Sequence, residues 1–117
     1  MSNYQYIDLN YLEEMSYGDA ELKATMLDML FDELPAELSK MRAHTDAQEW
    51  PQLSSVSHKM KSTLSFIGCD PLTEANRNIE LATKSGEHLD DLPAWMTQME
   101  QYYELVMPEL KQARAAL

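Results

Sequence analysis

The stretch Trp50-Pro51-Gln52-Leu53-Ser54-Ser55-Val56-Ser57-His58-Lys59-Met60-Lys61-Ser62-Thr63-Leu64-Ser65-Phe66-Ile67 decides the fold. Placed on a helix at about 100° per residue, its apolar side chains fall on one arc, and His58 lies opposite that arc. The arc comprises Leu53, Val56, Met60, Leu64 and Ile67. This pattern predicts an amphipathic helix that buries the arc against other helices and presents His58 to solvent.

Small and cationic side chains surround His58 on its own side of this helix. Within about 60° of it come Ser54, Ser55, Lys61, Ser62 and Ser65. Serine disfavours a helix, so a face meant only for solubility would usually carry Glu, Lys or Gln instead. The serines leave the imidazole accessible to a partner, and Lys61 and Lys59 place positive charge beside it. Phe66 and Trp50, near +80° and −80°, are apolar contacts that can flank the site.

Apolar spacing and capping residues predict four further helices, because strand patterns are nearly absent. A short helix spans about residues 8–16, capped by Asp8, with Leu12 and Met15 facing inward, and ends at Gly18. The next begins after Asp19, and Pro35 should kink it or split it near residues 33–34. Its stripe consists of Leu22, Met26, Met29, Leu30, Leu34, Leu38 and Met41.

The His58 helix is predicted to start in a capping box at Thr45-Asp46-Ala47-Gln48 and to run to Gly68. Asp70-Pro71 opens the following helix, and Lys84-Ser85-Gly86 closes it. A last long helix, kinked at Pro108, carries a stripe spaced by three and four residues: Leu89, Leu92, Met96, Met99, Tyr103, Val106, Leu110, Ala113 and Leu117. The pattern predicts an all-α protein in which an antiparallel four-helix bundle carries a short extra N-terminal helix.

The length, net charge and cysteine content of the chain limit its domain number, its partners and its compartment. The 117 residues suit a single domain over 1–117, for which we expect a monomer. A net charge of −11 disfavours nucleic acid and anionic membranes as partners. Of the stretches 1–39, 40–68 and 69–117, only residues 40–68, with two acids and four bases, are net-basic. A single cysteine, no apolar run long enough to span a bilayer and no leader pattern in the first ten residues predict a cytoplasmic protein.

The ordinary interpretation of a lone histidine on a polar helix face is a solvated side chain. A metal or redox site built from His44, His58, His88 or Cys69 is a weak alternative, because no two of them have the spacing of helical metal ligands. We therefore expect no metal site. Cys69 is expected to be a packed side chain rather than a reactive thiol.

The run from Ser57 to Gly68 also resembles the signature of histidine-containing phosphotransfer (HPt) domains. That signature is a His, a Lys three residues later, a small residue next, and a Gly after a further apolar stretch. Here these are His58, Lys61, Ser62 and Gly68. Leu72, residues 76–80 and residues 8–18 look like neighbouring parts of the same family, so the resemblance spans essentially the whole chain. Ser62 departs from the pattern, because the family usually has Gly there.

The resemblance implies a phosphorelay carrier in two-component signalling. His58 would accept a phosphoryl group from a receiver-domain aspartate and transfer it to another, with Lys61, Lys59 and Ser62 supporting the phosphate and Gly68 serving structure. Partners would be response-regulator receiver domains, with a hybrid sensor histidine kinase as a further candidate. The chain has no Gly-rich phosphate loop and no acidic trio for magnesium, so we expect no autokinase or ATP-binding activity and no cofactor of its own. Magnesium would reside on the receiver.

A different function remains open for the same fold. The bundle could act as an adaptor that docks on a receiver or kinase without carrying phosphate. Intact His58 and Lys61 favour phosphotransfer over this alternative, because an adaptor needs neither. The sequence does not identify the cognate kinase or receiver, the direction of phosphoryl flow or the pathway output.

Overall fold

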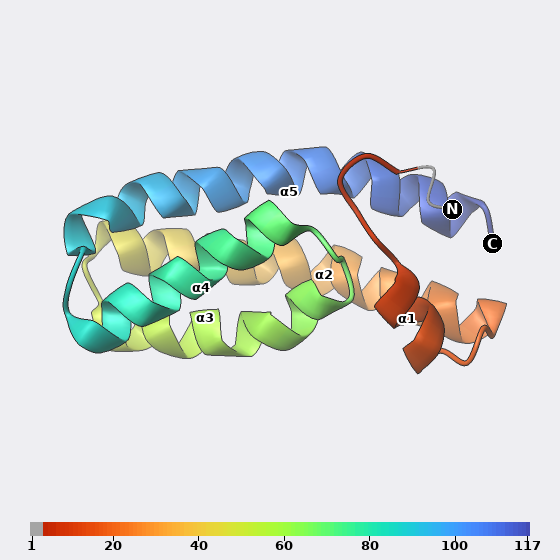
Figure 1. The fold of residues 1–117 in the computed structure, drawn as a ribbon, viewed down its shortest axis with the longest axis horizontal. Coiled ribbons are helices and arrows are strands. Elements are labelled where there is room, and N and C mark those ends of the chain that lie inside the picture. The colour runs from red at the N-terminus through yellow and green to blue at the C-terminus, as the bar shows by residue number, and fades with distance from the viewer. Residues whose placement is uncertain (1–3) are drawn as a thin grey trace.

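The structure is a computed structural model that describes residues 4–117, and their only regular elements are helices. They are α1 (Asn10–Met15), α2 (Ala20–Asp46), α3 (Trp50–Ser65), α4 (Asp70–Ser85), the 3-10 turn η1 (Leu89–Asp91) and α5 (Leu92–Ala115), shown in Figure 1. The predicted all-α class is confirmed. Residues 1–3, which carry part of the leader and domain predictions, lie outside the described residues.

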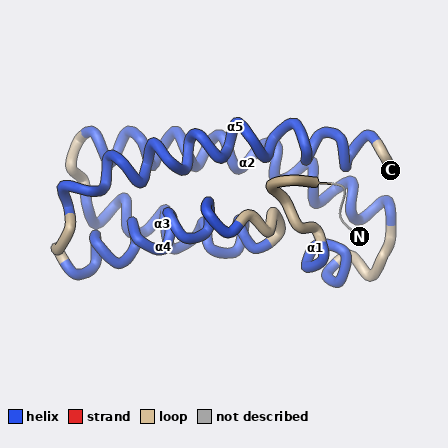
Figure 2. The backbone as a smooth tube through the Cα atoms, turned by 45° about the horizontal axis from the view of Figure 1, so that its top comes forward, coloured by secondary structure: helices blue, strands red, loops and turns tan. Residues whose placement is uncertain are grey.

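The four long helices form a bundle, as predicted, and α1 is the short extra helix (Figure 2). Within this bundle α3 packs on α2 and α4, and α5 packs on α4 and α2. Thus α3 and α5 lie on opposite corners. The N-terminal part of α2 extends past α3 and α4, and α1 lies beside it (Figure 1). Among residues 4–117, no helix combines the length and apolar character needed to cross a membrane.

The predicted stripes largely form the core. On α5 the buried members are Leu92, Met96, Met99, Val106, Leu110 and Ala113. On α2 they are Leu30, Leu34, Leu38 and Met41, joined by Leu27, which the prediction omitted. Three predicted inward residues, Met15, Leu22 and Met29, are exposed instead. They belong to α1 and the extended end of α2, where fewer helices are available to cover them. Leu117, beyond the end of α5, is exposed for the same reason.

The predicted start of α3 is wrong. Thr45 and Asp46 are the last residues of α2, and the buried Thr45 hydroxyl donates to the carbonyl oxygen of Met41 at 2.7 Å. The chain turns at Gln48, whose φ of 56° is left-handed, and α3 begins at Trp50. The sequence Thr-x-x-Gln fits a helix start, but burial of Thr45 favours continuing α2.

The structure confirms some of the predicted helix ends and changes others. Asp19 does cap α2, because its side chain accepts from the backbone N–H groups of Glu21 and Leu22. Leu9 occupies the cap position of α1, but the predicted Asp8 side chain accepts from the backbone N–H of Asn10 at 2.9 Å. The cap position of α4 is Cys69 rather than Asp70, one residue away from the prediction. Gly86 ends α4 in the left-handed conformation, as expected. Both α2 and α5 run unbroken through Pro35 and Pro108, so the predicted splitting of α2 does not occur.

The segment before α1 is tied to two parts of the bundle. The Glu109 carboxylate on α5 accepts from the backbone N–H groups of residues 5, 6 and 7 at 2.8–3.1 Å. Asp8 N–H then donates to the carbonyl oxygen of Ile67 at 3.0 Å. Gly68 follows with a φ of 67°, and a Cβ there would lie 2.2 Å from the Asp8 carbonyl oxygen. The end of α3 therefore needs a glycine, because the first segment crosses directly over it.

Candidate functional site

His58 lies in the middle of α3 with its side chain 63% exposed. Leu53, Met60 and Leu64, on the other side of α3, are completely or almost completely buried. Ile67, the last residue of the predicted arc, is also buried, whereas Val56 is half-buried. The arrangement matches the helical projection, and it makes the imidazole reachable from solvent.

A buried polar pair fixes how α3 is turned against α4. The Ser57 hydroxyl lies 2.8 Å from Oδ1 of Asn76 and 3.0 Å from the Asn76 carbonyl oxygen. In return, Nδ2 of Asn76 donates to the Ser57 carbonyl oxygen at 3.0 Å. Both side chains are buried, so rotation of α3 would leave polar groups unpaired in the core. The pair therefore sets the direction in which the next residue, His58, points.

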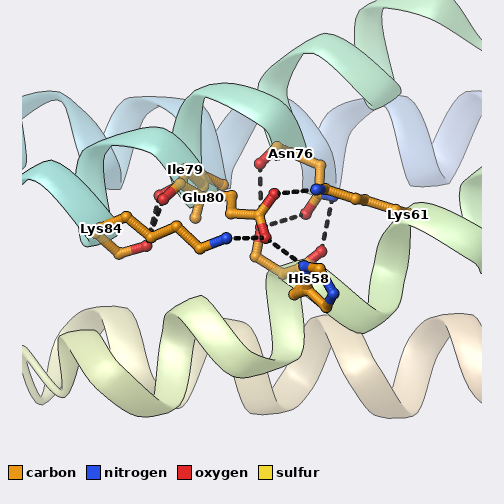
Figure 3. Close-up of polar contacts among 8 residues, drawn as sticks. His58, Lys61, Asn76, Ile79, Glu80 and Lys84 are labelled. Atoms are coloured by element: carbon orange, nitrogen blue, oxygen red, sulfur yellow. Dashed lines mark hydrogen bonds and ion pairs between the residues drawn. The ribbon is translucent and has the colours of Figure 1, made fainter.

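The centre of the site is the carboxylate of Glu80 on α4, which sequence analysis did not single out (Figure 3). Its Oε2 lies 2.7 Å from Nδ1 of His58 and 3.1 Å from Nζ of Lys84. Its Oε1 lies 2.6 Å from Nζ of Lys61. The Glu80 side chain is only 6% exposed, whereas its three partners are each more than half exposed. One buried carboxylate thus gathers three cationic or basic groups at the surface.

These contacts decide the ionisation of Glu80. Burial by itself raises the pKa of a carboxyl group, because it disfavours the charged form. Hydrogen bonds from Lys61, His58 and Lys84 outweigh burial and lower the pKa of Glu80 to about 2. Glu80 is therefore a carboxylate at neutral pH, with capacity only to accept hydrogen bonds.

The same contact assigns the tautomer of a neutral His58. Because the carboxylate cannot donate, the hydrogen between Nδ1 and Glu80 belongs to Nδ1. The other ring nitrogen, Nε2, then carries the lone pair. Figure 3 shows the ring of His58 held beside Glu80 through one nitrogen. The arrangement supplies a nucleophilic nitrogen without a further activating base.

The remaining predicted site residues lie around this centre. Ser55, Ser62, Ser65, Lys59 and Lys61 are exposed, and Ser54 is half-buried. The Ser65 hydroxyl donates to the Lys61 carbonyl oxygen at 2.8 Å, so it is engaged within α3. An open hollow of about 410 Å³ beside His58 is lined by Pro51, Ser54, Ser55, Lys59 and Lys84. Ser54 and Ser55 thus leave space next to the ring, as the sequence pattern predicts, whereas Ser62 lines a different groove.

Phe66 and Trp50 occupy different surroundings. Phe66 contacts the ring of Tyr11 on α1 and lines an apolar groove of about 180 Å³. This groove also includes Met26, Met29 and Ser62, one turn along α3 from His58. Trp50 is the first residue of α3 and packs half-buried against the core. The groove is therefore an apolar surface beside the site.

The metal or redox alternative gains no support. Among residues 4–117, no three His, Cys, Asp or Glu side chains are grouped so that they could hold a metal ion. His44 lies 3.0 Å from Glu49 and His88 lies 3.8 Å from Asp91, each near its own helix end. Cys69 is buried, and burial raises the pKa of its thiol, which makes it less reactive.

Glu80 and Lys84 are the two site residues that the sequence pattern did not reveal. A Glu followed by a Lys four residues later usually reads as an exposed helical ion pair. Here Glu80 faces α3, so its main partners come from a helix that precedes it by about 20 positions. The spacing within α4 gives no signal for this contact, because the partners of Glu80 on α3 are known only once the two helices are packed.

Comparisons with known proteins agree with this fold and motif. The structure resembles that of histidine-containing phosphotransfer protein B (HptB) from Pseudomonas aeruginosa PAO1, with a TM-score of 0.83, 24% identity and 96% of each chain covered. It also resembles the HPT domain of a sensor hybrid histidine kinase from Shewanella, with a TM-score of 0.79, 21% identity and 95% of each chain covered. A comparison with curated protein sequences finds no match.

The sequence itself assigns the family. Residues 25–115, which include the whole of α3, α4 and the Glu80 cluster, match the family described as the Hpt domain. This match spans well over half of the chain. The chain therefore belongs to the Hpt domain family, and it is a phosphocarrier domain rather than a kinase.

Proposed function

We propose that His58 accepts a phosphoryl group from the phosphoaspartate of one receiver domain and passes it to an aspartate of another. The observation that carries this proposal is the contact between Nδ1 of His58 and Glu80, at 2.7 Å, on a side chain that is 63% exposed. It supplies a fixed tautomer and an accessible second nitrogen. The family match supports phosphotransfer in general, and the choice of donor and acceptor is our inference.

The chemistry requires only one bond exchange in each direction. The Nε2 lone pair attacks phosphorus, an N–P bond forms, and the P–O bond to the aspartate breaks, so the aspartate leaves as a carboxylate. The ring becomes cationic in this step, because Nδ1 keeps its hydrogen. Glu80 can balance that charge through its contact with Nδ1. The N–P bond is a high-energy bond, so a second aspartate can take the group in the reverse reaction.

Charge neutralisation of the phosphoryl oxygens would be shared between the two proteins. Lys61 and Lys84 lie on the same carboxylate as His58, so their ammonium groups are close enough to turn from Glu80 towards a phosphoryl group. Lys59, exposed and without a carboxylate partner, adds positive potential. We assign magnesium to the receiver, because this chain offers no group of carboxylates for it among residues 4–117.

The partner contacts proposed here follow the surface around His58. Ser54, Ser55, Ser62 and Ser65 leave room for a receiver's active site, and the groove at Phe66 offers it an apolar contact. Trp50, the first residue of α3, would contact the receiver at the N-terminal end of this helix. The single cysteine supports a reducing cytoplasm as the compartment of this exchange.

The test is transfer of radiolabelled phosphate from a phosphorylated receiver domain to the purified chain. The label should be stable in base and lost in acid, as expected of a phosphohistidine, and it should disappear in His58→Gln. A label that persists in His58→Gln would disprove the assignment to His58. Stable binding of receivers without any label would favour the adaptor function instead.

A further inference from the structure

We propose that Arg77, on α4, is a recognition residue that binds a carboxylate on the face of the receiver around its active site. The proposal rests on the proposed function, because it assumes that a receiver docks at His58. It adds a contact from α4, outside the net-basic stretch of residues 40–68.

The first support is the pairing of cations over the chain. All nine Lys and Arg residues lie within residues 4–117, and six of them contact a carboxylate in ion pairs of 2.5–3.3 Å. In this described part, only Lys59, Arg77 and Lys111 have no carboxylate partner. An unpaired guanidinium is unusual in a chain whose acids outnumber its bases by 20 to 9, and it remains available to another protein.

The second support is the position of Arg77. It lines a cavity of about 390 Å³ between α3 and α4 together with Lys61, Glu80 and Leu81. Arg77 precedes Glu80 by three residues, which is a rise of about 4.5 Å along the helix. A protein interface of standard size covers about 800 Å² on each partner, a disc of roughly 16 Å radius. Glu80 is in contact with His58, so a receiver centred on His58 also covers Arg77.

The third support is the chemistry that the cavity offers. Arginine presents a planar fork that binds a carboxylate through two hydrogen bonds, with more directional preference than lysine. Leu81, one turn further along α4, is 59% exposed and provides an apolar contact beside it. The surface that this pair fits is an acidic side chain next to an apolar one. Because we assign magnesium to the receiver, and magnesium prefers carboxylate ligands, we expect acidic side chains around its phosphoacceptor aspartate, and Arg77 is complementary to them in charge.

The experiment measures transfer kinetics from chemically phosphorylated receiver domains. Receivers encoded in the source genome would be labelled with acetyl phosphate and magnesium, and the fastest donor to the wild type would be used throughout. Arg77→Gln should raise the half-saturating receiver concentration about three- to tenfold, with the rate at saturation unchanged. Arg77→Glu should raise it further, and added salt should reduce the difference from wild type.

Lys111→Glu is the matched control, because Lys111 is also exposed and unpaired but lies on α5, at the corner opposite α3. It should change the half-saturating concentration less than twofold. If Arg77→Glu behaves like Lys111→Glu, or lowers the saturated rate alone, Arg77 does not recognise the receiver and the proposal is wrong. If no receiver labels the wild type, the proposed function itself fails, which is a separate result.

Discussion

Oε2 of Glu80 lies 2.7 Å from Nδ1 of His58, so the most exposed functional group of the site is held by the one buried charged side chain among residues 4–117. This relationship combines two requirements that usually conflict. The imidazole must reach a partner, yet it must keep one orientation and one tautomer. Attaching it to a carboxylate that is fixed between α3 and α4 satisfies both.

Replacing Glu80 should slow phosphotransfer. In Glu80→Gln the amide oxygen can still accept from Nδ1, but Lys61 and Lys84 lose their anion and the developing ring charge is not balanced. We expect transfer to fall about tenfold, which is about 1.4 kcal/mol, and further in Glu80→Ala. Nitrogen NMR of His58 should show the Nε2–H tautomer gaining population in the alanine variant. Glu74→Gln, an exposed change on the same helix, is the control, and equal rates in all variants would contradict this role.

Glu80 should also contribute pH-dependent stability. Its pKa is lowered from 4.5 to about 2 in the folded state, so the charged form stabilises the fold above pH 4.5, and this contribution is lost as the pH falls towards 2. It amounts to about 3 kcal/mol at most, because its lysine partners are half-exposed and screened. In urea unfolding, the difference between wild type and Glu80→Gln should shrink between pH 4.5 and pH 2. A difference that stays constant over this range would show that Glu80 does not titrate as described.

Lys84 should retain the phosphoryl group once it is on His58. Its Nζ shares Oε2 of Glu80 with the ring, so it is positioned to turn towards a phosphate. Lys84→Gln should lower the transfer rate and the half-life of the phosphohistidine by about three- to tenfold each, as should Lys61→Gln. The half-life is measured from loss of label after the donor is removed. A half-life equal to that of Lys111→Gln would restrict Lys84 to an ordinary helical ion pair.

Two glycines offer a matched test of how the first segment is held. Gly68→Ala places a Cβ 2.2 Å from the Asp8 carbonyl oxygen, so backbone must move, and we expect a loss of about 2–4 kcal/mol in the free energy of unfolding. Gly86→Ala has a similar φ of 75° but nothing within 4 Å, and should cost about 1 kcal/mol. The free energy of unfolding of both variants is measured by denaturant unfolding. Equal losses would mean that the close approach of Asp8 carries no energetic weight.

The parts of the fold that sequence predicts well depend on repetition. The α5 stripe repeats the three- and four-residue spacing across the helix, so an error at one position, such as the exposed Leu117, does not alter the conclusion. The start of α3 depends on a few residues instead. Thr45 suits a cap and also the last turn of α2, and only its burial decides between them.

In the candidate site, likewise, one feature can be predicted from a single helix and another depends on how the helices pack. The exposure of His58 follows from the angle between it and the arc on a single helix, so the sequence predicts it. The role of Glu80 depends on how α3 and α4 pack, which the Ser57 and Asn76 pair determines. No spacing within one helix encodes that contact. A Glu on a helix is ordinarily solvated, and nothing before the packing is known distinguishes Glu80 from Glu74.

The most direct measurement is the site of phosphorylation at atomic level, by phosphorus and nitrogen NMR of the protein labelled with nitrogen-15 in histidine and phosphorylated by a receiver. We expect one phosphorus coupled to Nε2 of His58, with Nδ1 still protonated. Phosphorus on Nδ1, on His44 or His88, or on a carboxylate would contradict it.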